Sequence, residues 1–158
     1  MKDYQEKFML AAIEQARKGI ALHQTPFGAC IVKDGEVLSL AHNTVWSGSD
    51  ITAHAEMQAI RQACRCLGGV DLSGCEIYST CEPCPMCFSA CHWSRIEVIY
   101  FGASIADARA AGFNELAISN DRMKCAGESS VEVKGGFLQE ECRALFGEWA
   151  RKGNKNIY

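Results

Sequence analysis

Apolar positions recur every three or four residues in two long stretches of the chain, which is the spacing of one helical face. The first stretch covers residues 4–20 and ends near Gly19. Its apolar residues are Met9, Ala12, Ile13, Ala16 and Ile20. The second covers residues 137–152, with Phe137, Leu138, Cys142, Leu145, Phe146 and Trp149 on its apolar stripe. Both are predicted to be helices that pack one face on a core.

Shorter runs rich in β-branched and aromatic residues predict strands. They cover residues 27–32, 36–41, 76–79 and 96–101, with a further edge strand over 131–133. Lys33-Asp34-Gly35 separates the first two runs, and Asp-Gly is a strong hairpin signal. We expect these two strands to pair antiparallel.

Helical segments alternate with the later strands. Residues 53–67 and 84–94 are predicted helices, and Gly68-Gly69 ends the first of them. Residues 42–49 are expected to form a loop and residues 154–158 a tail. Residues 104–125 are the least periodic stretch, with a short helix predicted over 105–110. Strand-helix-strand alternation predicts an α/β fold with parallel strands, helices on both faces of the sheet and a site at the strand ends.

Length and composition indicate one domain over residues 1–158 and a core that needs no disulfide. The start of the chain is charged, and no segment has the length of an apolar membrane span, so we expect a cytoplasmic protein without membrane contact. Most of the ten cysteines are then expected to be small buried groups.

The balance of charge argues against a nucleic-acid partner. The net charge is −3, and the sixteen Lys and Arg residues are scattered along the chain. Proteins that neutralise phosphates usually cluster these residues.

One histidine and two cysteines have the chemistry of a zinc site: His54, and the pair Cys84 and Cys87 in Pro-Cys-Pro-Met-Cys. Three protein ligands leave a fourth tetrahedral position open, which distinguishes a catalytic zinc site from a closed structural one. The cysteines are three residues apart at the predicted start of a helix, where Pro83 is tolerated and the helix dipole favours thiolates.

Glu56 follows His54 by two residues and would point about 200° away from it on an ideal helix. It is therefore expected to carry protons rather than bind metal. His-x-Glu with Pro-Cys-x-x-Cys is the zinc nucleobase deaminase signature. The alternative is a structural zinc site completed by Cys81 or Cys91, which would leave Glu56 without a purpose.

Beyond these motifs, the chain resembles the cytidine deaminase superfamily, and within it bacterial guanine deaminases, from end to end. The resemblance rests on Thr25-Pro-Phe-Gly-Ala29, Val32-Lys-Asp-Gly35, Asn43, Thr52-Ala-His-Ala-Glu56, Cys81-Glu-Pro-Cys-Pro-Met-Cys87, Trp93, Ala111-Gly-Phe113 and an aromatic last residue. It implies a three-layer α/β/α fold with a mixed five-stranded sheet. It also implies a homodimer in which the C-terminal segment, residues 153–158, is exchanged between protomers.

The same resemblance implies the roles of individual residues. His54, Cys84 and Cys87 would bind Zn²⁺, and Glu56 would shuttle protons. Asn43 would hydrogen-bond the base, with Phe27, Ala55, Trp93 and the partner's Tyr158 completing its pocket. Taken alone, Asn43 reads as a turn residue, Phe27 and Trp93 as packing residues, and Tyr158 as a frayed terminus.

One departure concerns the acidic pair that such enzymes often carry as two aspartates, where this chain has Asn114 and Glu115. Glu115 keeps a carboxylate with a longer reach, and we expect it to assist a second proton transfer. By itself it would be a solvated loop charge.

The predicted activity is zinc-dependent hydrolytic deamination of a small purine base, with guanine converted to xanthine and ammonia. The alternatives are deamination of adenosine in transfer RNA, of guanosine, cytosine or a triazine, or a zinc-stabilised interaction module without catalysis.

Overall fold

The computed structural model describes residues 2–153 and 156–158, with side chains from residue 5 onward. In this part of the chain, one mixed sheet has the strand order β2-β1-β3-β4-β5. Its strands are β1 (Gly28–Lys33), β2 (Glu36–His42), β3 (Cys75–Cys81), β4 (Val98–Ala103) and β5 (Glu132–Lys134). Strand β1 runs antiparallel to both β2 and β3, whereas β3, β4 and β5 are parallel.

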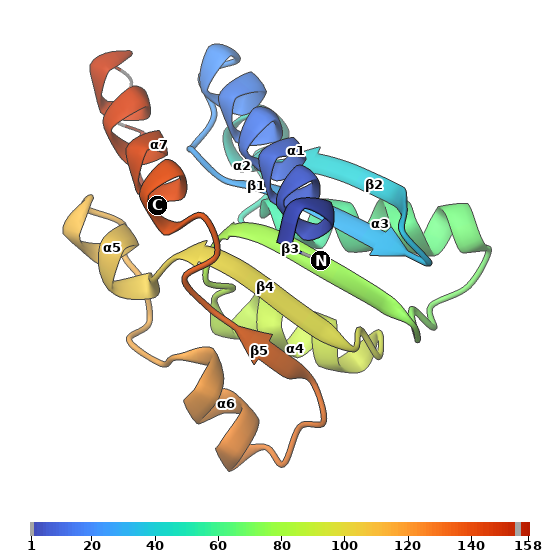
Figure 1. Cartoon of the computed structure of the whole chain (residues 1–158). Helices are drawn as coiled ribbons and strands as arrows, with labels where there is room; N and C mark the ends of the chain where they lie inside the picture. The colour runs from blue at the N-terminus through green and yellow to red at the C-terminus, as the bar shows by residue number, and fades with distance from the viewer. Residues whose placement is uncertain (1, 154–155) are drawn as a thin grey trace.

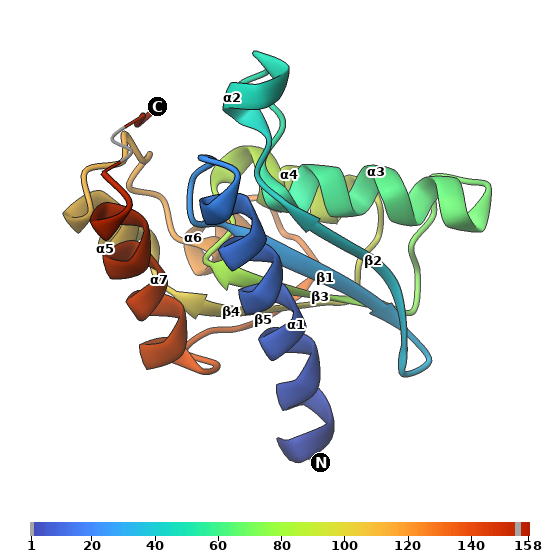
Figure 2. The ribbon, with the colours of Figure 1, turned by 90° about the horizontal axis from the view of Figure 1, so that it is seen from above.

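Helices cover both faces of the sheet, which confirms the predicted three-layer α/β/α architecture (Figures 1 and 2). The long helices α1 and α7 lie on one face, and α3 and α4 on the other. The helices are α1 (Lys2–Ala21), α2 (Val45–Gly48), α3 (Ala55–Leu67), α4 (Pro85–Trp93), α5 (Ile105–Ala110), α6 (Asn120–Ala126) and α7 (Gln139–Arg151). Among them we find no candidate for a membrane-spanning segment.

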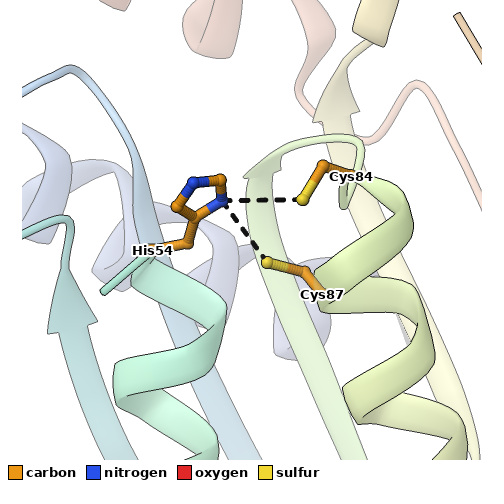
Figure 3. A group of neighbouring side chains, drawn as sticks. All are labelled: His54, Cys84 and Cys87. Carbon is orange, nitrogen blue, oxygen red and sulfur yellow. Dashed lines mark hydrogen bonds between the residues drawn. The ribbon is translucent and has the colours of Figure 1, made fainter. Parts of the chain in front are cut away.

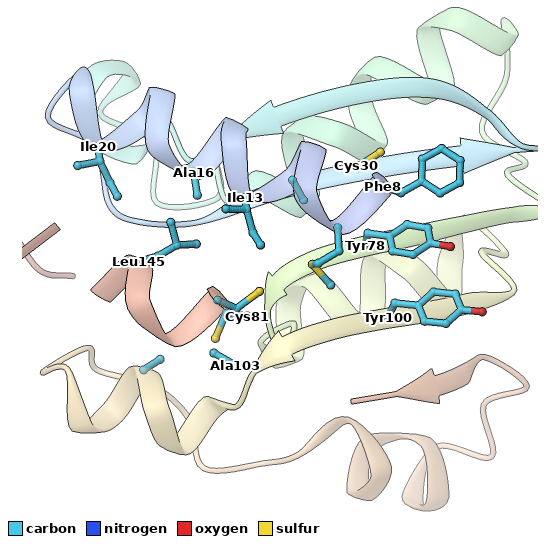
Figure 4. Packing of buried hydrophobic residues seen from close by; sticks show 14 of the residues in the cluster. Phe8, Ile13, Ala16, Ile20, Cys30, Tyr78, Cys81, Tyr100, Ala103 and Leu145 are labelled. Atoms are coloured by element: carbon cyan, nitrogen blue, oxygen red, sulfur yellow. The ribbon is translucent and has the colours of Figure 1, made fainter. Parts of the chain in front are cut away.

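Successive residues of β1 point to opposite faces of the sheet and enter different cores. Cys30 and Val32 face α1 and α7, and Ala29 and Ile31 face α3 and α4. Figure 4 shows part of the first core, in which α1 packs over the sheet. The rings of Tyr78 and Tyr100 stack across the β3–β4 pair, with centroids 4.7 Å apart.

The predicted hairpin between β1 and β2 is confirmed. Asp34 and Gly35 both have positive φ, of 49° and 79°, which is the geometry of a two-residue turn whose twist matches the strands. At the other end of β1, a side chain on Gly28 would collide with the backbone oxygen of Ala12. Glycine therefore lets α1 rest directly on this strand.

The predicted elements are present, with ends that differ by a few residues. Two helices were missed: α2 lies in the expected loop over 42–49, and α6 lies in the aperiodic stretch. Both have seven residues or fewer, too few for a periodic pattern to show. Of the predicted tail, residues 154–155 lie outside the described residues, and residues 156–158 form neither helix nor strand.

Candidate metal centre and catalytic cavity

Two helices begin at the same point of the molecule, and a predicted metal ligand precedes each. His54 is the N-cap of α3 and Cys84 the N-cap of α4, both with extended backbone. Each helix therefore starts later than predicted, and Pro85 rather than Pro83 occupies the first turn. The positive ends of two helix dipoles converge here, which favours negatively charged groups.

The side chains of His54, Cys84 and Cys87 meet between these helix ends (Figure 3). His54 Nδ1 lies 3.6 Å from Cys84 Sγ and 3.6 Å from Cys87 Sγ. An ideal tetrahedral zinc ion bound by imidazole nitrogen and thiolate sulfur separates those atoms by about 3.6 Å. The three residues thus fit zinc without rearrangement, with Nδ1 as the histidine ligand atom.

Cys84 is the more acidic of the two thiols. The Cys84 sulfur accepts hydrogen bonds from Cys87 and His54, which outweigh burial and lower the pKa of Cys84 to about 4. Cys84 is therefore a thiolate at neutral pH, the form that binds zinc. Within the described chain, Cys81 and Cys91 are outside the ligand group. Neither completes the structural Cys₃His site that was the alternative.

Glu56 lies in the first turn of α3, almost completely buried, and outside the ligand group. Its Oε1 is 3.0 Å from the Ser79 hydroxyl and its Oε2 is 3.5 Å from the Cys87 sulfur. Burial raises the pKa of this carboxyl above its ordinary value. A carboxyl that accepts a proton readily beside an open ligand position has the properties of a general acid/base.

Glu115 faces the same cavity from the loop between α5 and α6. Burial, with the nearby charges of Cys84 and Glu56, raises its pKa to about 7. A group that is half protonated at neutral pH can both give and take a proton. The residues lining the cavity are Phe27, Asn43, His54, Glu56, Cys81, Glu82, Cys84, Glu115 and Tyr158.

Asn43 is completely buried, and its side-chain amide is held on both sides. Its Oδ1 accepts a hydrogen bond from the Val45 backbone N–H at 3.0 Å, and its Nδ2 donates to the Tyr158 hydroxyl at 2.5 Å. One amide hydrogen and one lone pair remain for another partner. Phe27 lines the cavity and also packs on Phe113, with ring centroids 5.0 Å apart.

Tyr158 lies in the cavity of its own chain. Its ring centroid is 5.3 Å from that of His54, and its hydroxyl is 3.2 Å from Thr25 Oγ1. The sequence predicted that it closes a partner's site. In this chain the last residue closes the site of the same chain, because residues 156–158 turn back over it. The homodimer and the exchange of this segment stay predictions.

Two residues that were predicted to contact the substrate do not line the cavity of this chain. Trp93 is 81% exposed and lies at the far end of α4, about 12 Å along the helix from Pro85. It lines a separate hollow with Met123 and Ser129. Ala55 is buried against the sheet and is not among the residues that line the cavity.

Sequence reasoning missed three residues at the site. Ser79 contacts Glu56, and Thr25 contacts Tyr158. Glu82 lines the cavity while its carboxylate accepts the backbone N–H groups of Ile105 and Asn120, the first residues of α5 and α6. Thr25 and Glu82 lie within the motifs quoted above, over residues 25–29 and 81–87. Their hydrogen-bond partners are distant in sequence and are known only from the folded chain.

Comparison with known proteins agrees with this site. Residues 2–103 match the family described as the cytidine and deoxycytidylate deaminase zinc-binding region. The fold and the site thus define a hydrolytic deaminase, and the chain belongs to this zinc-binding deaminase family.

Two kinds of relative cover nearly the whole chain. Guanine deaminase of Bacillus subtilis is 39% identical over 97% of this chain and 98% of its own length. The tRNA-specific adenosine deaminase of the same species is 35% identical over 95% of this chain and 91% of its own length. A solved guanine deaminase from Nitrosomonas europaea superposes with a TM-score of 0.85 at 30% identity, covering 92% of this chain and 84% of that one.

Proposed function

We propose that the protein deaminates guanine, which takes up one water at C2 and yields xanthine and ammonia. The observation that carries the proposal is one small cavity lined by two of the metal ligands, His54 and Cys84, together with Glu56, Asn43, Glu115 and Tyr158. The full-length similarity to a guanine deaminase supports it.

The bound metal would be zinc, held by His54, Cys84 and Cys87. Zinc lowers the pKa of a coordinated water from 15.7 to about 7 and so supplies a nucleophile at neutral pH. The residues of the chain supply orientation and proton transfer. Asn43 presents its free amide hydrogen and lone pair to the edge of the base, a bidentate pairing that fixes the ring.

Glu56 carries the protons of the reaction. It takes one from the attacking water and delivers it to the ring nitrogen next to C2. It then moves the proton of the new hydroxyl group on C2 to the amine, which leaves as ammonia while the C2 carbonyl forms. Its burial suits this role, because burial raises the pKa of the carboxyl and so makes Glu56 a better proton acceptor. Glu115, with a pKa of about 7, provides a second donor and acceptor on the same cavity.

The charges of the residues that line the cavity and the hollow beside it favour a small substrate over RNA. A second hollow adjoins the cavity at Tyr158 and is lined by Ile51, His54, Cys84, Pro85, Met86, Asn114, Glu115, Leu116 and Tyr158. None of the described residues that line either hollow is Lys or Arg. Proteins that hold a folded RNA place cations along its phosphates.

A panel of substrates tests the proposal. Ammonia release is measured from guanine, adenine, cytosine, guanosine and a tRNA anticodon hairpin, with the protein at equal concentration and its zinc content known. We expect guanine to give the highest kcat/KM. Higher activity on the hairpin would show instead a tRNA adenosine deaminase, the activity of the second relative, and no release from any of them would support an interaction module.

A further inference from the structure

The last three residues of the chain are fixed over the site by contacts of different kinds. The backbone oxygen of Tyr158 accepts a hydrogen bond from Asn114 N at 3.3 Å, while the hydroxyl of Tyr158 reaches Asn43 and Thr25. The Ile157 side chain lies beside Gly112, where an added Cβ would come within 3.3 Å of Ile157 Cδ1. We call residues 156–158 the C-terminal strap.

One anchor of the strap lies outside the cavity. Trp46 Nε1 donates a hydrogen bond to the backbone oxygen of Asn156, at 3.1 Å. The indole belongs to α2, a helix of four residues that projects at the same end of the molecule as the C-terminus (Figure 2). Trp46 is 42% exposed, which is high for so large an apolar side chain, and this contact reaches across 110 positions of sequence.

The same short helix also holds Asn43. The backbone N–H of Val45 donates to Asn43 Oδ1, and the next residue, Trp46, holds the strap. The strap in turn places the Tyr158 hydroxyl on Asn43 Nδ2. The contacts therefore form a closed ring that runs from Asn43 through α2 and the C-terminal strap back to Asn43.

We propose that Trp46 is a positioning residue that latches the C-terminal strap over the cavity, so that Tyr158 covers the bound base. The expected effect of this latch on KM rests on the proposed deamination of guanine, whereas the latch contact itself does not depend on that activity. A chain whose closed state is less populated binds its substrate more weakly in proportion, because only the closed fraction is competent.

The substitution W46F keeps a ring at this position and removes the N–H donor. The loss of one such hydrogen bond corresponds to about a two- to tenfold change in an equilibrium. We expect carboxypeptidase to release Tyr158 from W46F about two- to tenfold faster than from the wild-type protein, as followed by mass spectrometry of the intact chain. We also expect KM for guanine to rise by no more than this factor while kcat changes little.

S47A is the matched control. Ser47 is the neighbour of Trp46 in α2, and its hydroxyl donates an exposed hydrogen bond to the Thr44 backbone oxygen without touching the strap. S47A should release Tyr158 at the wild-type rate. An equal rate for W46F and the wild type, or equal acceleration by both substitutions, would overturn the proposal.

A double substitution separates the latch from a general loosening of the fold. In a Y158A background the strap no longer reaches Asn43, so adding W46F should leave KM unchanged. A further rise of KM on adding W46F would count against the latch. The carboxypeptidase measurement needs no substrate, so it tests the latch even if guanine is not deaminated, and an unchanged release rate in an active guanine deaminase would refute the latch alone.

Discussion

The hydroxyl of Ser79 lies between Glu56 and the backbone, 3.0 Å from Glu56 Oε1 and 2.7 Å from the oxygen of Cys81. A hydroxyl has a single hydrogen and can donate to only one of the two at a time. When Glu56 is ionised, Ser79 can donate to it. When Glu56 is protonated, the carboxyl can donate to Ser79, which then donates to Cys81. The pair accommodates both proton states of Glu56 without moving the backbone.

We therefore expect S79A to lower kcat by about two- to tenfold with little change in KM, because the loss of one hydrogen bond leaves Glu56 less well oriented. Steady-state kinetics on the preferred substrate measures this. S39A is the control, since the buried Ser39 hydroxyl donates to the backbone oxygen of Ala59 on the same helix, α3, and not to the Glu56 carboxylate. A drop of the same size in S39A would assign the effect to stability.

E56Q should retain the metal and lose most turnover. Glu56 is not in the ligand group, so zinc content by elemental analysis should match that of the wild-type protein. A positioned acid/base contributes about 10²- to 10⁴-fold, and kcat should fall by that amount.

The contrasting variant is C84A, which removes a ligand and should lose both zinc and activity. It should also unfold at a lower temperature, because a metal that binds only the folded chain stabilises it. An E56Q protein without zinc would show that Glu56 is a ligand.

E115Q should change how stability depends on pH. The pKa of Glu115 is about 7 in the folded chain, against an ordinary value of 4.5. Between these values the folded chain binds more protons than the unfolded chain, so the free energy of unfolding decreases as pH rises through this range. Glutamine cannot ionise, so E115Q should lose less stability between pH 5 and pH 8. Thermal unfolding at both pH values measures the difference.

E36Q serves as the control for this measurement, since Glu36 is an exposed carboxylate at the start of β2. It should follow the wild-type dependence. If E115Q also follows it, Glu115 is not the buried group that the structure indicates.

G28A should destabilise the fold strongly. The added methyl would collide with the Ala12 backbone oxygen. Because the colliding atom belongs to the backbone, no side-chain rotation can relieve the clash, and α1 must move away from β1. Overpacking of this kind costs about 1–3 kcal/mol or more in the free energy of unfolding. G69A has open space around the new methyl and should change stability by no more than about 0.5 kcal/mol. Urea unfolding of both variants makes the comparison, and equal midpoints would contradict the close packing.

Local signals were sufficient for much of the fold. Asp34-Gly35 specifies a turn whose backbone twist joins β1 and β2, and this depends on those residues alone. The apolar stripes of α1 and α7 likewise depend on neighbours within each segment. The short helix α6 has no such stripe. Its start is capped locally by the Ser119 hydroxyl and also by the carboxylate of Glu82, 38 positions away.

The sequence by itself predicted the group of His54, Cys84 and Cys87, because His-x-Glu and Cys-x-x-Cys each place their side chains through local backbone geometry at a helix start. It also determined the family, through motifs along the whole chain. Only the tertiary structure brought the Tyr158 hydroxyl to Asn43 and left Trp93 exposed, outside the lining of the cavity. Those relationships join segments up to 115 positions apart, and nothing in the local pattern of either segment encodes the other.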